Sequence, residues 1–243
     1  MNINVATLKR ALKELKKTTL KDSSSDFSRC FFSEGRIFTK DGLSSSSMMI
    51  ECDLEFNVNF IEFNNFINSL DSKENVNFSF ENGVVNIKSL NSEINMDHCV
   101  LDITFETTTY ENVIEGEITI SNDIFDAIDK NNPKLELNGL LLDFKANNIV
   151  STNTKVLTIK PMLETELEVK IIIPKYVLNK NSTLKNVSFD GRFITFTDSN
   201  IERNVALIDG RFPEYHRIVP KSFRRDIKIN GNELKQKLKK MVI

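Results

Sequence analysis

A short unit of one strand followed by one helix recurs along this sequence, and it constrains the fold more than any other feature. The copies start with strand-like segments at 3–5, 56–58, 118–120, 169–173 and 227–229. Each is followed by apolar residues at helical spacing, and Pro174 suits the first turn of the fourth helix. The units start roughly 50 to 60 residues apart, which is typical of repeated supersecondary structure.

Strand patterns fill the intervals between these units. The expected strands are 29–39, 47–52, 76–80, 84–88, 98–105, 135–145, 149–151, 156–159, 187–189, 193–197 and 205–208. Turn dipeptides such as Glu34-Gly35, Asn82-Gly83 and Asp190-Gly191 accompany them. This pattern indicates antiparallel sheets whose strands are joined by tight turns.

A longer repeat relates the two halves of the chain. The segment 76–83 resembles 187–191, and 99–102 resembles 206–209, so related sequences recur roughly 110 residues later. Two similar domains, each built from two of the shorter units, would account for both periods.

We therefore predict an α+β fold with two domains, about 1–112 and 113–222, each with two helices on one face of antiparallel sheets. A polar stretch near residue 110 suits the boundary between them. Residues 223–243 resemble the opening strand and helix of a third domain.

Composition narrows the class of protein. The 243 residues are 40% hydrophobic and 27% charged, which is typical of a soluble globular protein. Net charge is −2, but residues 1–21 and 221–243 are rich in Lys and Arg while the rest is acidic. Cys30, Cys52 and Cys99 are dispersed, which favours a reducing compartment, and no signal peptide or membrane span is evident. We expect a cytoplasmic protein.

The sequence carries no catalytic constellation. His98 and His216 lack metal-ligand spacing to Cys or carboxylates, so each is expected to be structural or superficial. The eight Gly form no phosphate loop, and no Ser lies in a nucleophile turn. We expect no enzymatic activity, no metal and no cofactor.

The segment 207–220 is the most specific motif. It reads Leu-Ile-Asp-Gly-Arg-Phe-Pro-Glu-Tyr-His-Arg-Ile-Val-Pro, with a turn at Asp209-Gly210, an apolar anchor at Phe212 and a fixed backbone at Pro213. We expect Phe212 to be buried and Tyr215 at least partly so. The order resembles the segment that closes the second domain of the bacterial DNA polymerase III beta subunit, the sliding clamp. A strand and proline-containing loop with chance similarity is the alternative.

The resemblance implies the sliding-clamp (DNA clamp) fold, in which helices line a channel inside a continuous outer sheet. It covers nearly the whole chain in pattern, but only about 135–220 in specific residues. It implies a DNA polymerase processivity factor that encircles duplex DNA without reading its sequence. A polymerase and a clamp loader would be its partners. The ring would be a homo-oligomer, either a trimer or, if a third domain is missing, a dimer.

The helices expected over 7–17 and 232–241 each combine an apolar stripe with a cationic face. The stripes comprise Leu8, Ala11, Leu12 and Leu15 in the first helix and Leu234, Leu238 and Met241 in the last. The cations that would meet DNA phosphates in a clamp are Arg10, Lys13, Lys17, Lys239 and Lys240. The last stripe needs a covering surface, so we expect 226–243 to be docked elsewhere or poorly ordered.

Ordinary amphipathic helices with solvated lysines are the alternative to this DNA-facing surface. In addition, Asp123, Asp126 and Asp129 would make the third helix acidic on its exposed side.

The resemblance also implies a groove that takes an apolar peptide from polymerases and other partners. The positions that match its lining are Leu137, Thr154, Lys155, Val156, Pro213, Arg217 and Ile218. The family's Thr-Asp-Gly-His-Arg-Leu run is replaced here by Ser-Thr-Asn-Thr-Lys-Val at 151–156, and the tail that completes the groove is absent. We expect an altered or partial groove, and the alternative is that these apolar residues are simply core.

Two other functions remain open from the sequence. One is a clamp-like protein-interaction module that does not encircle DNA. The other is an unrelated function on the same repeated scaffold, since a fold does not determine a function.

Overall fold

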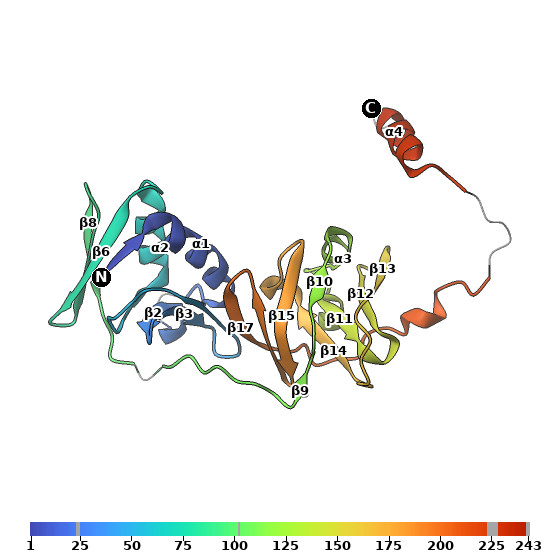
Figure 1. The fold of residues 1–243 in the computed structure, drawn as a ribbon, viewed down its shortest axis with the longest axis horizontal. Helices are drawn as coiled ribbons and strands as arrows, with labels where there is room; N and C mark the ends of the chain where they lie inside the picture. The colour runs from blue at the N-terminus through green and yellow to red at the C-terminus, as the bar shows by residue number, and fades with distance from the viewer. Residues whose placement is uncertain (23–24, 102, 223–227, 242–243) are drawn as a thin grey trace. The chain divides into compact units, whose positions relative to one another are not determined.

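The computed structural model describes the chain except for residues 23–24, 102, 223–227 and 242–243. The chain divides into two compact units, Met1–Phe212 and Pro213–Ile243 (Figure 1). The domain boundaries near 112 and 222 stay predictions.

The larger unit contains one order of elements twice. The first half runs β1 (Asn2–Asn4), α1 (Val5–Leu15), β2 (Arg29–Ser33), β3 (Arg36–Lys40), β4 (Ser45–Met49), β5 (Phe56–Asn59), α2 (Phe60–Ser69), β6 (Asn75–Glu81), β7 (Val84–Lys88) and β8 (Glu93–Asp97). The second runs β10 (Ile118–Ile120), α3 (Asn122–Asp126), β11 (Gly139–Asp143), β12 (Asn148–Thr152), β13 (Leu157–Pro161), β14 (Lys170–Pro174), η5 (Lys175–Val177), β15 (Ser182–Phe189), β16 (Phe193–Asp198) and β17 (Ile201–Ala206). A 3-10 turn, η5, stands where the first half has α2.

The described strands form three antiparallel sheets. Their orders are β1-β6-β7-β8, then β10-β15-β16-β17-β4-β3-β2-β5, and β13-β12-β11-β14, with the short β9 (Asn112–Val113) paired to β15. Each half would by itself make two four-stranded sheets of the same topology. The middle sheet becomes continuous because β17 of the second half pairs with β4 of the first, from Ile201 opposite Met48 to Asn204 opposite Ser45.

Two apolar cores lie in the larger unit, one for each half. In the first core, α1 and α2 pack on the strands. Its aromatic residues are Phe, since the chain contains no Trp. Phe32 stacks on Phe56 at 4.4 Å between ring centroids and meets Phe63 edge-on at 5.7 Å. In the second, Phe144 stacks on Phe189 at 5.1 Å. Such ring pairs add about 0.5–1.5 kcal/mol beyond their buried area.

The predicted turn chemistry is confirmed at two hairpins. Glu34 and Gly35 have φ of 50° and 70°, and Asn82 and Gly83 have 53° and 78°. Positive φ at both central residues is the two-residue turn that matches the twist of paired strands.

Three sequence predictions about elements are wrong. The strand expected at 98–105 is absent from the described part of that segment, and the ladder is instead made by β8, whose polar residues alternate with inward Ile94 and Met96. The helix expected after Pro174 is only η5, because β15 begins too soon for further helical turns. The strand expected at 227–229 is not formed by Lys228 and Ile229, and Ile227 lies outside the described residues.

The smaller unit contains the 3-10 turn η6 (Tyr215–Arg217) and helix α4 (Gly231–Met241). Asn230 caps α4, since its side-chain oxygen accepts from Asn232 N–H at 3.0 Å and Glu233 N–H at 3.3 Å. None of the helices in the described ranges has the length and apolar character needed to cross a membrane.

Gly139 on β11 lies very close to β14, so a substitution there tests the packing of these two strands. A Cβ at Gly139 would lie 2.6 Å from Ile172 Cγ2 and 2.7 Å from the Ile173 carbonyl oxygen, whereas one at Gly191 would meet nothing within 4 Å. We predict that Gly139→Ala lowers the free energy of unfolding by about 1–3 kcal/mol through overpacking. Urea denaturation measures the change, with Gly191→Ala as the control. Equal stabilities of the two variants would contradict the packing described for β11 and β14.

Candidate functional site

Helix α1 carries the first group of cations predicted to face DNA. Asn4 caps the helix by accepting a hydrogen bond from Ala6 N–H at 3.0 Å. Its predicted stripe is fully buried, at 0% exposure for Leu8, Ala11, Leu12 and Leu15. Arg10 and Lys13 are exposed on the opposite side. The charged ends of these two side chains are thus accessible to a polyanion.

Lys17 does not lie on this exposed surface, so its predicted orientation is wrong. The chain leaves α1 in a 3-10 turn, η1 (Lys16–Thr18), and the Lys17 side chain is directed into a polar cluster. Its Nζ lies 3.0 Å from Glu14 Oε2 and donates to Asn179 Oδ1 at 2.6 Å and to the Leu178 carbonyl at 3.2 Å. Burial, and then the charge of Arg203, lower the pKa of Lys17. Its ammonium is committed to internal partners.

Helix α4 carries the second predicted group. Lys239 and Lys240 are exposed, and Lys237 pairs with Glu233 at 2.9 Å. Leu234 and Leu238 are 41% and 51% exposed. The helix therefore has the expected amphipathic character, and the covering of its apolar side stays a prediction.

The acidic third helix is largely neutralised by neighbouring lysines. Asp123 Oδ2 lies 2.8 Å from Lys160 Nζ, and Asp126 pairs with Lys180. The hydrogen bond from Lys160, followed by the one from Ser121, lowers the pKa of Asp123 to about 2. The two carboxylates on α3 are therefore paired, while Asp129 lies beyond the end of the helix, where its Oδ1 accepts from Asn131 N–H at 3.1 Å.

The residues predicted to line a peptide groove are divided between the two units. Leu137, at the end of the 3-10 turn η3 (Leu135–Leu137), is 2% exposed and belongs with the buried residues. Thr154, Lys155 and Val156 are exposed in the turn between β12 and β13, where Asn153 Oδ1 accepts from the N–H groups of Lys155 and Val156 at 3.0 and 2.8 Å. In the smaller unit Pro213, Arg217 and Ile218 are exposed. Leu137 fits the core alternative, and the other six are accessible.

The anchor of the closing motif is buried as predicted. Phe212 is 7% exposed and Tyr215 is 2% exposed. The rings of Tyr215 and His216 lie 3.8 Å apart between centroids. His216 is thus an exposed ring beside Tyr215, in line with its expected structural or superficial role.

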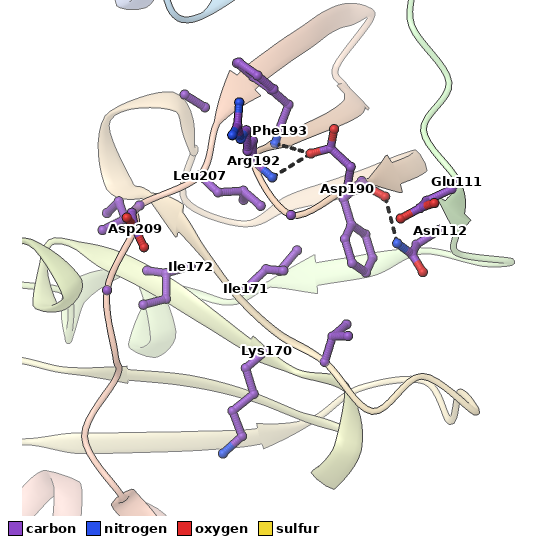
Figure 2. Close-up of a pocket in the computed structure, with 16 residues that line it drawn as sticks. Glu111, Asn112, Lys170, Ile171, Ile172, Asp190, Arg192, Phe193, Leu207 and Asp209 are labelled. Atoms are coloured by element: carbon purple, nitrogen blue, oxygen red, sulfur yellow. Dashed lines mark hydrogen bonds between the residues drawn. The ribbon is translucent and has the colours of Figure 1, made fainter.

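A cleft of about 770 Å³ in the second half was not anticipated from the sequence. It is lined by β14, the β15–β16 turn, the end of β17 and residues 111–112 (Figure 2). Asp190 closes its own turn by accepting from the N–H groups of Arg192 and Phe193, both at 2.6 Å, and Asn112 Nδ2 donates to the Phe189 carbonyl at 3.1 Å. Of the segments that line this cleft, the sequence predicts the turn at Asp190-Gly191.

Within the described ranges, no group of three or more His, Cys, Asp or Glu could hold a metal ion. His98 Nδ1 accepts from Asn57 N–H at 3.2 Å, and its ring meets Phe80 at 4.9 Å between centroids. Burial, and then the charge of Arg29, lower the pKa of His98, which suits a neutral acceptor. His98 is therefore a structural residue.

Comparison with known proteins shows similarity in fold and in part of the sequence. No protein-family model matches the sequence. The beta sliding clamp of Helicobacter pylori strain J99 is 29% identical over 125 residues, which is 46% of this chain. The fold is similar to the Helicobacter pylori beta clamp bound to a DNA ligase peptide, with a TM-score of 0.77, 22% identity, and coverage of 98% of this chain and 75% of that one.

This chain has the fold of the bacterial beta sliding clamps, and part of its sequence is similar to theirs. The DNA polymerase III subunit beta of Pseudomonas aeruginosa has the same fold, with a TM-score of 0.70 and 14% identity over 91% of this chain and 68% of that one. The sequence match spans only 33% of the length of the Helicobacter pylori clamp. The beta clamp fold is thus shared across the chain, while close sequence similarity is confined to part of it.

Phe212 offers a test of the family motif. We predict that Phe212→Ala lowers the free energy of unfolding by about 3–5 kcal/mol, because a buried ring is replaced by a cavity. Leu135→Ala, at a side chain that is 65% exposed, serves as the control and should change stability by less than about 0.5 kcal/mol. Chemical denaturation followed by circular dichroism measures both. A loss below about 1 kcal/mol for Phe212→Ala would show that the motif does not anchor the fold.

Proposed function

We propose that this chain is a DNA polymerase processivity factor, a sliding clamp that encircles duplex DNA and tethers a polymerase. The observation that carries the proposal is the β17–β4 pairing, which fuses two copies of one topology into a single sheet. Repeating the same pairing from copy to copy is how a ring could be built. A ring converts weak phosphate contacts into topological retention and keeps a polymerase at high effective concentration.

The free sheet edges of the larger unit support ring closure. Among the described strands, β8 and β13 each end a sheet. By the internal repeat β8 corresponds to β17, and β13 corresponds to β4. A β8 edge can therefore meet the β13 edge of a second copy as β17 meets β4, which is a heterologous, head-to-tail contact. Three two-domain chains would close a ring of six domains, and two chains with a third domain each would do the same.

The cations of α1 support a sequence-independent contact with DNA. Arg10 and Lys13 are exposed, and contacts from such cations to phosphates carry no sequence information. Lys239 and Lys240 on α4 would add to this contact. Lys17 is withdrawn from the proposed set because its ammonium is bound internally.

Partner proteins would bind through a short apolar peptide. The Helicobacter pylori clamp was solved with a DNA ligase peptide. We extend this to exposed residues of each unit taken by itself, which are Thr154, Lys155 and Val156 in the larger unit and Pro213, Arg217 and Ile218 in the smaller one. A polymerase and a clamp loader are the proposed partners. The cytoplasm is the proposed location, and it would keep the three free cysteines reduced.

Retention on circular DNA tests the proposal directly. The chain is assembled at high concentration on nicked circular DNA and on the same DNA after linearisation, and both are then passed through a column at high salt. A closed ring should stay on the circle and slide off the linear ends. Equal retention on both forms would favour the alternative, a clamp-like interaction module that does not encircle DNA.

The cationic face has its own test. We predict that Arg10→Ala with Lys13→Ala weakens DNA binding for every sequence and flattens the plot of log affinity against log salt by about two contacts' worth. Lys145→Ala with Arg192→Ala removes the same charge away from α1 and serves as the control. Fluorescence anisotropy over a salt series measures both pairs. Equal losses for the two pairs would assign the effect to net charge and remove α1 from the DNA-facing surface.

Assembly can be tested at the β8 edge. We predict that the molar mass measured by light scattering rises with protein concentration, and that Asn95→Pro suppresses the rise. Asn95 corresponds to Asn204, which pairs with Ser45 in the internal joint, and proline on an edge strand blocks pairing with another strand. Asn95→Thr keeps the strand and should associate like the unmodified chain. A monomeric mass at every concentration would refute the head-to-tail contact.

A further inference from the structure

A cluster of buried and half-buried charged side chains crosses the joint between the two halves of the larger unit. Arg203, on β17 of the second half, is 0% exposed. Its Nη2 donates to Glu14 Oε2 on α1 at 2.7 Å, and its Nη1 donates to Ser46 Oγ on β4 at 2.6 Å. One guanidinium from the second half thus binds two separate elements of the first half.

The other side chains of the cluster are further hydrogen-bond and ion-pair partners of Glu14. Glu14 Oε2 also accepts from Lys17 Nζ at 3.0 Å and from Asn179 Nδ2 at 2.9 Å. Asn179, which precedes β15 in the second half, also donates to Asp198 Oδ2 at 3.0 Å. Two cations, Arg203 and Lys17, are therefore balanced by two carboxylates, Glu14 and Asp198. Burial acts to raise the pKa of Glu14, but the hydrogen bonds from Asn179 and Lys17 hold it below its ordinary value.

Such a cluster is better suited to fixing geometry than to adding stability. Desolvation of buried charges offsets most of their attraction, so an apolar pair of similar volume could stabilise the joint as well. Removing Arg203, however, leaves Glu14 and Asp198 with Lys17 as the one remaining cation of the cluster, and such an imbalance is costly away from water. The planar guanidinium also accepts only a narrow range of partner directions. The halves can therefore shift against each other only by breaking this cluster.

The opposite face of the same strand pair carries a different kind of contact. Arg36 on β3 pairs with Glu202 on β17 at 2.8 Å, and both side chains are 23% exposed. Water and salt screen a pair of this kind, which typically contributes about 0–1 kcal/mol. The joint therefore has one buried and one solvent-accessible ion pair, formed by neighbouring residues of β17.

The two free edges have no counterpart of the buried pair. Met96 on β8 and Val205 on β17 are both buried, and they face Val85 and Ile194 at the same place in their hairpins. Arg203 lies two residues before Val205 on β17. The corresponding residue on β8, two before Met96, is Ile94. Ser46 on β4 pairs with Thr39 on β3, and Thr158 on β13 pairs with Ser151 at the corresponding position of β12. Thr158 therefore stands on the free edge where Ser46 stands in the joint.

We propose that Arg203 is a positioning residue that, through Glu14 and Ser46, holds the β17–β4 joint closed and fixes α1 against the second half. The joint inside the chain is then stiff, whereas a contact between β8 and β13 of two copies lacks this element. The orientation of Arg10 and Lys13 follows from that of α1, and this consequence alone rests on the proposed function.

Hydrogen exchange on the full chain without DNA tests the proposal. In Arg203→Met, amides of β4 and β17 should exchange about tenfold faster or more, while those of β6–β7 and β11–β12 keep their rates. In the control Arg36→Met, the same joint amides should change by less than about threefold, because the pair it removes is accessible to water. Arg203→Lys keeps the charge but not the planar fork, and it should show the same selective increase to a smaller extent.

Three results would overturn the proposal. Equal exchange at the joint in the Met variants of Arg203 and Arg36 would show that the buried pair has no special role. A uniform rise across both cores in the Arg203 variants would assign the residue to general stability. Wild-type exchange in Arg203→Lys, if the Met variant does not fold, would show that the guanidinium geometry is not needed. None of these measurements depends on DNA, so they fail or hold separately from the proposed clamp activity.

Discussion

The pairing of β17 with β4 is the contact on which the rest of this structure depends. It joins Ile201–Asn204 to Ser45–Met48 by a short antiparallel ladder. Without it the two halves would be separate modules, each with two small sheets and its own core. With it, one continuous sheet runs through both halves. Backbone pairing is well suited to this task, because its hydrogen bonds fix the relative direction of the strands, while the side chains on the two faces select the register.

Side chains on both faces of that ladder determine how firmly it holds. The serines of β4 are small and let Arg203 approach the strand from one side. On the other side Arg36 bonds both Glu202 and Ser47. Farther along, Ser44 Oγ contacts the Tyr176 hydroxyl at 3.1 Å and accepts from Ala206 N–H at 3.2 Å. The serines at 44–47 thus form the surface at β4 that receives the second half.

The cations on α1 and on the turn that follows it differ in their exposure to solvent, because they lie at different positions and have different partners. Arg10 and Lys13 lie opposite the buried stripe and stay solvated, as the helical period requires. Lys17 lies beyond the last α-helical residue, where a 3-10 turn changes the direction of its side chain. There it meets Glu14 and Asn179, which compete successfully with water for its ammonium. A charge count alone could not distinguish these lysines.

The sequence by itself determined the repeat, the apolar stripes of α1 and α4, the hairpin turns and the burial of Phe212. These follow from local periodicity, from residues that tolerate positive φ, and from a specific motif. Only the tertiary structure decided that β8 replaces the expected strand at 98–105, and that the helix after Pro174 is a single turn. It alone revealed Arg203 as the buried link between the halves. Such features depend on which distant segments meet, and strand partners far apart in the chain leave no periodic signal in either one.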